Sequence, residues 1–315
     1  MKSAFVFPGQ GSQVVGMGKE LAENSTHARS VFDEVNDALD QNLSSLMFEG
    51  PIEDLTLTSN AQPALMATSI AVVRVLEKEF GLKLSELVTY MAGHSLGEYS
   101  ALAAAGTLNL SDTARLLKIR GEAMQRAVPV GIGAMAAIMG AEFSVVEDIA
   151  AKAADEEVCT AANDNADGQV VISGHKGAVE RAMNMAKEAG IKRAILLPVS
   201  APFHCVLMQP AADEMADALA GTTFNSPSVP IITNVSADVV SDPNVLRSQL
   251  VKQITGRVRW RESVLRMGEL GITDLTELGT GKVLGGLVKR INKEISGKSI
   301  QTMADIEAFV IELNL

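Results

Sequence analysis

The chain has 315 residues, 47% of them hydrophobic and 21% charged, a composition that is typical of a folded globular protein and excludes intrinsic disorder. Its formal net charge of −11 disfavours non-specific binding to nucleic acid, although local basic patches could still bind an acidic partner. Since no apolar run is long enough to span a bilayer and the N-terminus lacks the apolar core of a signal peptide, we expect a cytoplasmic protein without a membrane segment.

In the first part of the chain, short apolar runs alternate with amphipathic segments. The pattern predicts strands over 3–8 (SAFVFP) and 87–94 (LVTYMAGH), and helices over 28–40, 61–81, 96–106 and 112–127. Strands that alternate with helices in this way predict an α/β fold with a mostly parallel sheet that is covered by helices on both faces.

Residues 131–197 follow a different order of elements. Three strand-like runs (GAMAAIMG, EVCTAAN and QVVISG), the helical runs SVVEDIAAKAAD and KGAVERAMNMAKEAG, and a final strand-like RAILLPV give the order β-α-β-β-α-β. This order is typical of a ferredoxin-like unit. We therefore expect a ferredoxin-like small subdomain over 131–197, inserted into one discontinuous large domain formed by residues 1–130 and 198–315.

Ser95 lies in GHSLG, with Gly93 and Gly97 two residues away on either side, between a predicted strand and a predicted helix. A G-x-S-x-G motif in this context indicates a nucleophile elbow, in which a tight turn without space for larger residues exposes the serine hydroxyl. The N-terminus of the following helix offers N–H groups, first that of Leu96, to a developing oxyanion. An ordinary glycine-bounded turn is the alternative, because so short a motif also occurs by chance.

A serine nucleophile needs a base, and the chain has four histidines. His27 lies in a polar segment and His175 in a turn of the small subdomain, while His94 is expected to pack away from the adjacent serine hydroxyl. His204 lies on a loop between a strand end and a helix start, where parallel-sheet enzymes build their sites. We therefore favour His204 as the base over the alternative of a structural histidine.

Arg120 lies within the apolar stripe of the helix over 112–127, four residues after Leu116. A guanidinium in this position either extends to the protein surface or is held inside for an anion, and its fork of donors suits a carboxylate. The pattern alone favours the surface position.

Six motifs in a fixed order resemble one protein family: FVFPGQGSQ, GHSLGE, RGEAMQ, GQVVISG, PFH and ELGTGKVLGGLVKRI. Together they make nearly the whole chain similar to the malonyl-CoA:acyl carrier protein transacylases of type II fatty acid synthesis. The resemblance implies an α/β-hydrolase-like large domain with a ferredoxin-like insert. It also implies ping-pong transfer of a malonyl group from coenzyme A to the phosphopantetheine thiol of acyl carrier protein, without a cofactor or metal, and we expect a monomer.

The resemblance also implies the roles of individual residues. Ser95 corresponds to the nucleophile that forms an ester with the malonyl group, and His204 to the base. The backbone N–H groups of Gln10 and Leu96 correspond to the oxyanion hole. Arg120 corresponds to the arginine that binds the malonyl carboxylate.

Further positions match the family with fewer implied details. The backbone carbonyl of Gln253 would orient the histidine in place of an acidic third member. Phe203, Asn163 and Asn234 correspond to residues that line the site, and Phe203 together with Leu96 resembles the members that select malonyl groups. Asp167 and Arg257 each replace a proline that is common in the family, so we expect changes in loop stiffness rather than in chemistry.

An acidic carrier protein should bind a basic patch, unless these charges form an ordinary solvated surface. The two candidate patches are the set Lys187, Lys192 and Arg193 in the insert and the set Lys282, Lys289 and Arg290 near the C-terminus. A hydrolase of the same fold is a rival function, but it would normally have an acid at a strand end between serine and histidine, and often an HGGG loop. A non-catalytic scaffold, the second rival, would have lost the serine or the histidine.

Overall fold

The computed structural model describes residues 2–199 and 201–313. The strands of its larger part are β1 (Ser3–Phe7), β2 (Tyr90–Gly93), β7 (Ile231–Ile232), β8 (Val239–Val240), β9 (Asp274–Leu278) and β10 (Ser296–Ile300). The helices of the first half of this part are α1 (Lys19–Asn24), α2 (Thr26–Leu39), α3 (Leu43–Glu49), α4 (Ile52–Thr56), α5 (Thr58–Lys78), α6 (Leu84–Leu87), α7 (Gly97–Ala104) and α8 (Leu110–Ala127). Those of the second half are a 3-10 helix (Val206–Met208), α11 (Gln209–Ala220), α12 (Pro243–Thr255), α13 (Trp260–Glu269), α14 (Val283–Ile291) and α15 (Met303–Glu312).

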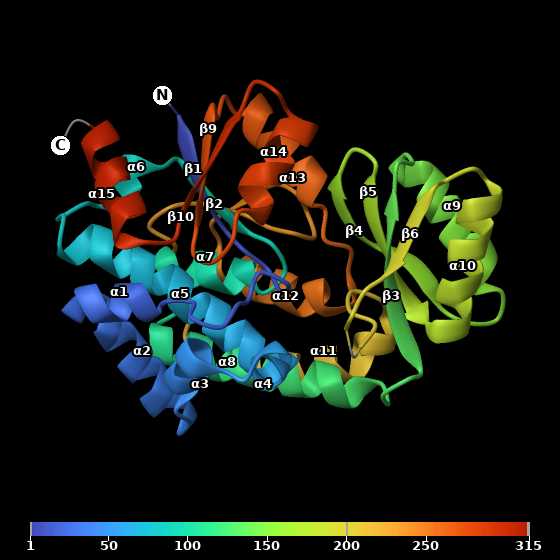
Figure 1. Cartoon of the computed structure of the whole chain (residues 1–315), viewed down its shortest axis with the longest axis horizontal. Helices are drawn as coiled ribbons and strands as arrows, with labels where there is room; N and C mark the ends of the chain where they lie inside the picture. Colours follow the sequence, from blue (N-terminus) through green and yellow to red (C-terminus); the bar gives the residue numbers. More distant parts are fainter. Residues whose placement is uncertain (1, 200, 314–315) are drawn as a thin grey trace.

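The six strands form one sheet in the order β10-β9-β1-β2-β7-β8, which is parallel except for the β7–β8 pair. Successive residues of β1 point to opposite faces of this sheet. Phe5 and Phe7 join the hydrophobic cluster that contains α5 and α7, whereas Ala4 and Val6 join the cluster that contains α13 and α14. Helices therefore cover both faces (Figure 1), and the predicted α/β fold with a mostly parallel sheet is confirmed.

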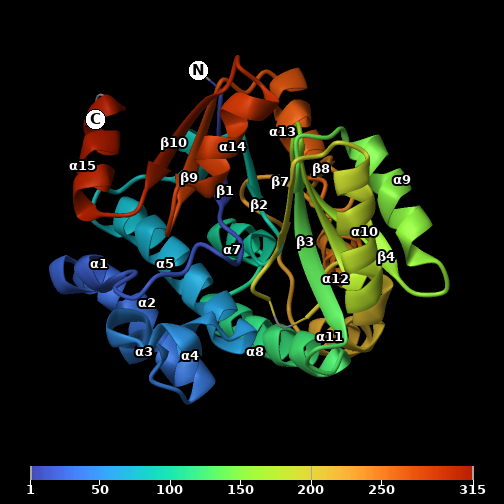
Figure 2. The same cartoon turned by 45° about the vertical axis from the view of Figure 1, so that its right-hand side comes forward.

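The smaller part consists of β3 (Gly133–Met139), α9 (Phe143–Ala154), β4 (Cys159–Ala166), β5 (Gln169–His175), α10 (Lys176–Glu188) and β6 (Arg193–Leu196). The predicted order β-α-β-β-α-β is thereby confirmed. Its strands form an antiparallel sheet in the order β4-β5-β3-β6. Figure 2 shows α9 and α10 on the outer side of this sheet, so that the inner side, with Met135 and Val171, packs against the core of the larger part.

Most predicted helices and strands are present with small shifts at their ends. The helix expected over 28–40 begins at Thr26, because the Ser25 side chain accepts a hydrogen bond from the N–H of Ala28 and caps it. The helix expected over 61–81 instead spans Thr58–Lys78 and contains Pro63. A proline costs nothing in the first turn of a helix, where its missing N–H has no partner, but here burial of nearly the whole helix stabilises an additional turn before it.

Backbone and side-chain contacts tie the two parts together beside β4. The N–H of Val258 donates to the carbonyl of Ala162, and the N–H of Asp164 donates to the carbonyl of Val258, both at 2.9 Å. The two residues that depart from the family pattern form ion pairs here: Arg257 lies 3.6 Å from Glu147 of α9, and Asp167 lies 3.7 Å from Arg261 of α13. These contacts fix the smaller sheet beside the carboxyl ends of β1 and β2.

Candidate active site

Ser95 occupies the turn between β2 and α7, as the motif predicts. A Cβ on Gly93 would lie 1.9 Å from the carbonyl carbon and oxygen of Gly97, and a Cβ on Gly97 would lie 2.2 Å from the carbonyl oxygen of Phe7. Both positions therefore require glycine, because strand and helix backbones approach too closely for any side chain. Ser95 itself has a φ of 53°, a left-handed conformation that is rare for residues with a Cβ and is typical of strained functional turns.

The Ser95 hydroxyl lies beside the imidazole of His204, with 2.8 Å between Oγ and Nε2. His204 is nearly fully buried on the loop that precedes the 3-10 helix, and its backbone also has a positive φ, 58°. The predicted pairing of these two residues, 109 positions apart in the chain, is thus present as a direct contact.

Gln253 determines which imidazole nitrogen carries the proton. Its backbone carbonyl oxygen lies 2.8 Å from Nδ1 of His204, and a carbonyl can only accept a hydrogen bond. Nδ1 must therefore be protonated in the neutral ring, and Nε2 is free to accept the serine proton. Burial, followed by the Arg120 charge, lowers the pKa of His204 from 6.5 to about 3, so the ring is neutral around pH 7.

The Arg120 side chain points into the site and is only 1% exposed. The surface position that its sequence pattern favours is wrong, because the apolar stripe of α8 faces a core that continues to Ser95. Its Nη2 donates to Ser95 Oγ at 3.2 Å and to Gln253 Oε1 at 2.8 Å, and its Nη1 donates to Gln62 Oε1 at 2.8 Å. All three acceptors are neutral, so the site contains a buried cation that can bind an anionic group.

Asn234 holds the backbone of the elbow. Its Oδ1 accepts from the N–H of Ser95 at 2.7 Å, and its Nδ2 donates to the carbonyl of Gly93 at 2.6 Å. Since the Ser95 N–H is engaged in this way, the N–H of Leu96, the residue before α7, is the next donor available to an oxyanion.

The cavity around Ser95 has a volume of about 480 Å³ and is lined by both parts of the chain. Gln10 and Phe203 of the larger part line it, as the resemblance implies, and the Gln10 side chain donates to Thr58 Oγ1 at 3.3 Å. From the smaller part come Asn163, which is buried, and the apolar side chains of Met135 and Val171. The structure thus brings the candidate site residues named from the sequence together, but Asn234 and Gln253 are fully buried behind the cavity wall and do not line it, contrary to the expectation for Asn234.

Sequence reasoning missed two buried polar residues at this site. Gln62 of α5 binds Arg120, and Glu98 of α7 accepts from Gln253 Nε2 at 3.0 Å. A glutamine and a glutamate within otherwise apolar helical runs were the available signal. His94, which we expected to pack, is half-buried, and its Nε2 lies 2.8 Å from Asn165 Oδ1.

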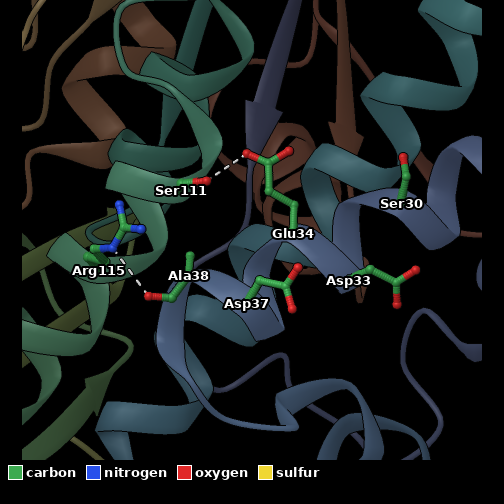
Figure 3. A pocket seen from close by; sticks show the side chains of 7 residues that line it. All are labelled: Ser30, Asp33, Glu34, Asp37, Ala38, Ser111 and Arg115. Atoms are coloured by element: carbon green, nitrogen blue, oxygen red, sulfur yellow. Dashed lines mark hydrogen bonds between the residues drawn. The ribbon is translucent and has the colours of Figure 1, made fainter.

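A second hollow of similar volume, about 480 Å³, lies between α2 and α8 (Figure 3). Acidic side chains of α2 line it, namely Asp33, Glu34 and Asp37. The guanidinium of Arg115 in this hollow already donates to the carbonyl of Ala38. Because this hollow offers neither a histidine nor a free cation among its lining residues, we assign the chemistry to the cavity around Ser95.

Within residues 2–199 and 201–313, no group of three or more His, Cys, Asp or Glu side chains is arranged to hold a metal ion. In the same part of the chain, no helix combines the length and apolar character needed to cross a membrane.

The fold and the site define the class of acyl transferases: residues 4–278 match the family model described as the acyl transferase domain. The malonyl CoA-acyl carrier protein transacylase of Bacillus subtilis (strain 168) is 47% identical over 307 residues, which cover 97% of this chain and 95% of that protein. The chain therefore belongs to the malonyl CoA-acyl carrier protein transacylase family.

Solved structures agree with this assignment. The acyl-carrier-protein-S-malonyltransferase from Bartonella henselae is 55% identical, with a TM-score of 0.97 and full coverage of both chains. A second structure, described as a type II PKS acyl-carrier protein in complex with its malonyl-transacylase, is 42% identical, with a TM-score of 0.95 over 99% of this chain and 100% of that one.

Proposed function

We propose that this protein transfers a malonyl group from coenzyme A to the phosphopantetheine thiol of an acyl carrier protein, in fatty acid synthesis, through an ester on Ser95. The observation that carries this proposal is the environment of a single oxygen atom. Ser95 Oγ lies 2.8 Å from the base nitrogen of His204 and 3.2 Å from the guanidinium of Arg120. A nucleophile, a base and a buried cation therefore lie close enough to contact one malonyl group at the same time.

In the first half-reaction, Ser95 Oγ attacks the thioester carbonyl carbon while His204 Nε2 takes the hydroxyl proton. The carbonyl oxygen becomes an oxyanion, and the backbone N–H groups of Gln10 and Leu96 donate to it. When the carbon–sulfur bond breaks, the coenzyme A sulfur receives the proton from His204. The product is a malonyl ester on Ser95, and each step uses only groups of this chain and the substrate.

The second half-reaction reverses these roles with a different thiol. His204 takes the proton of the phosphopantetheine thiol, and the sulfur attacks the ester carbonyl. Ser95 leaves with the proton from His204, and the malonyl group now resides on the carrier protein. The Gln253 carbonyl keeps Nε2 as the acceptor throughout, because it holds the Nδ1 proton.

Selection of malonyl groups is assigned to Arg120, whose neutral partners leave its charge available to the malonyl carboxylate. Phe203 and Asn163 limit the width of the cavity beside the acyl group. Asn234 keeps the elbow in its left-handed conformation by accepting from the Ser95 N–H.

Intact-protein mass measurement tests this function directly. After incubation with malonyl-CoA and quenching, the protein should gain the mass of one malonyl group, and the Ser95→Ala variant should gain none. Addition of carrier protein with its phosphopantetheine arm should remove the adduct and malonylate the carrier. Rapid release of free malonate in the absence of carrier would instead indicate a hydrolase of the same fold.

Of the two candidate basic patches, we propose that the carrier protein docks on the insert, at Lys187, Lys192 and Arg193. These side chains are exposed, and β6, which begins at Arg193, leads directly into Leu197, a residue that lines the cavity. In the other patch, the Arg290 guanidinium is already engaged with Gln169 at 2.6 Å.

Charge reversal distinguishes the two patches. The double variant Lys192→Glu and Arg193→Glu should raise the KM for carrier protein and leave the KM for malonyl-CoA unchanged. The matched control, Lys282→Glu and Lys289→Glu, should leave both values unchanged. A raised KM for carrier in the control variant alone would assign docking to the C-terminal patch.

We also propose that residues 1–130 and 198–315 form an α/β-hydrolase-like domain and that residues 131–197 form a ferredoxin-like subdomain. The helices on both faces of the six-stranded sheet support the first assignment, and the strand order β4-β5-β3-β6 supports the second. A monomeric state and a cytoplasmic location remain proposals from the sequence.

A further inference from the structure

Glu98 is a fully buried acid beside the catalytic serine, and the mechanism above does not use it. It lies on the first turn of α7, three residues after Ser95, and is 0% exposed. Burial raises the pKa of its carboxyl to about 7. Because burial of a carboxyl costs free energy unless hydrogen bonds compensate, the contacts of Glu98 indicate what it does.

One oxygen of Glu98 accepts two hydrogen bonds at the centre of the site. Oε2 accepts from the backbone N–H of Asn234 at 2.8 Å and from Nε2 of Gln253 at 3.0 Å. The same Nε2 also donates to the backbone carbonyl of Ser95 at 3.0 Å. A third, longer contact runs from this nitrogen to Asn234 Oδ1 at 3.4 Å. The amide nitrogen of Gln253 thus faces three acceptors, one of which is the carboxyl of Glu98.

These contacts allow only one direction of the Gln253 amide. A flipped amide would bring its oxygen against these three acceptors and its NH₂ group against the guanidinium of Arg120, which has only donors. In the observed direction, Oε1 of Gln253 accepts from Nη2 of Arg120 at 2.8 Å. The same Nη2 lies 3.2 Å from Ser95 Oγ, so the amide sets the distance between the cation and the nucleophile.

We propose that Glu98 is a positioning residue: through the Gln253 amide it holds the Arg120 guanidinium in the orientation that favours acyl groups ending in a carboxylate. This inference rests on the proposed role of Arg120 as the carboxylate-binding residue. Without an acceptor at Glu98, the Gln253 amide loses one of the hydrogen bonds that direct its oxygen toward Arg120. The guanidinium then has more than one orientation, and the preference for a carboxylate at the end of the acyl group falls.

Two variants of Glu98 separate this role from a purely structural one. Glu98→Gln can keep a carbonyl oxygen at the position of Oε2, whereas Glu98→Leu has similar volume and no acceptor. The readout is the ratio of kcat/KM for malonyl-CoA to kcat/KM for acetyl-CoA. Partial misfolding lowers both values by the same factor and leaves this ratio unchanged, so a structural role alone does not move it.

We expect Glu98→Leu to lower the ratio by about tenfold or more, the size of a lost hydrogen bond to a charged group, and Glu98→Gln to stay within about twofold of the natural protein. A natural ratio in Glu98→Leu overturns the proposal. Arg120→Ala tests separately whether Arg120 binds the carboxylate. If this variant also keeps the natural ratio, the proposed role of Arg120 fails, and the role of Glu98 fails with it.

Gln253→Met tests the same route without altering Glu98, in case Glu98→Leu does not fold. This variant removes the amide and keeps the backbone carbonyl that binds His204. Its ratio should fall as in Glu98→Leu, and a natural ratio overturns the proposal. The double variant Glu98→Leu and Gln253→Met should have the ratio of Gln253→Met alone, because the effect of Glu98 passes through the amide. A further fall in the double variant overturns that route.

Discussion

His204 should remain a neutral base at pH values where an exposed histidine is almost fully protonated. Burial and the Arg120 charge lower its pKa from 6.5 to about 3. At pH 5, a histidine with a pKa of 6.5 is about 3% neutral, whereas one with a pKa near 3 is about 99% neutral. The fraction of protein whose His204 can accept the Ser95 proton at pH 5 should therefore be about 30-fold larger than an unshifted histidine would give.

The assay is a single-turnover reaction with malonyl-CoA at limiting concentration, quenched at set times between pH 5 and pH 8 and read as the mass of the seryl ester. The second-order rate constant reports ionisations of the free protein. We expect no loss of rate attributable to His204 down to pH 5. The carboxyl of malonyl-CoA stays ionised over most of this range, because ordinary carboxyl groups have pKa values of about 4.

Glu98, with its pKa of about 7, is the group that could imitate a histidine titration in this range. The same profile is therefore measured in Glu98→Gln, which does not ionise. A step near pH 7 that is absent from this variant belongs to Glu98. A fall with a midpoint near 6.5 that persists in Glu98→Gln, and leaves a few per cent of the rate at pH 5, would refute the reasoning about His204.

Three further predictions concern Arg120, the tight turn around Ser95 and the buried carboxyl of Glu98. Arg120→Lys should give a malonyl-to-acetyl ratio of kcat/KM between those of the natural protein and Arg120→Ala, because an ammonium keeps the charge but not the fork of donors; a natural ratio would contradict binding by two parallel hydrogen bonds. Gly93→Ala should lower Tm by at least several degrees, about the effect of 1–3 kcal/mol of overpacking, while Gly286→Ala, with open space around its Cβ, should not; equal Tm values would contradict the close approach at the elbow. The raised pKa of Glu98 means that its ionisation opposes the folded state, so stability from this group is present below pH 4.5 and is lost as the pH rises through about 7. In urea unfolding, the free energy of unfolding of Glu98→Gln, taken relative to that of the natural protein, should therefore rise by about 3 kcal/mol between these pH values. A difference between the two proteins that does not change with pH would contradict this.

Local patterns in the sequence were sufficient to predict the main strands and the longer helices of residues 1–197 and the turn that carries Ser95. The spacing of Gly93, Ser95 and Gly97 depends on a turn of a few residues, so its geometry follows from neighbours in the chain. His204 could be chosen because the chain has only four histidines, of which His27 lies in a polar segment, His175 in a turn and His94 directly beside the serine in the chain.

The orientation of Arg120 could not be predicted from its helix alone. An apolar stripe indicates which face of a helix is buried, but not whether that face meets a closed core or a cavity. The three partners of Arg120 are 25, 58 and 133 residues away in sequence, so only the folded chain brings them together. The contact of Glu98 with Gln253, 155 residues apart, was missed for the same reason.

Met135 and Val171 form a wall of the cavity, and they belong to a sheet that carries neither Ser95 nor His204. Replacement of these two side chains can therefore widen or narrow the space for the acyl chain while the reacting atoms keep their spacing. Substitutions on the inner surface of the insert can therefore admit branched or longer acyl groups, in evolution or by design, without changes to Ser95, His204 or Arg120.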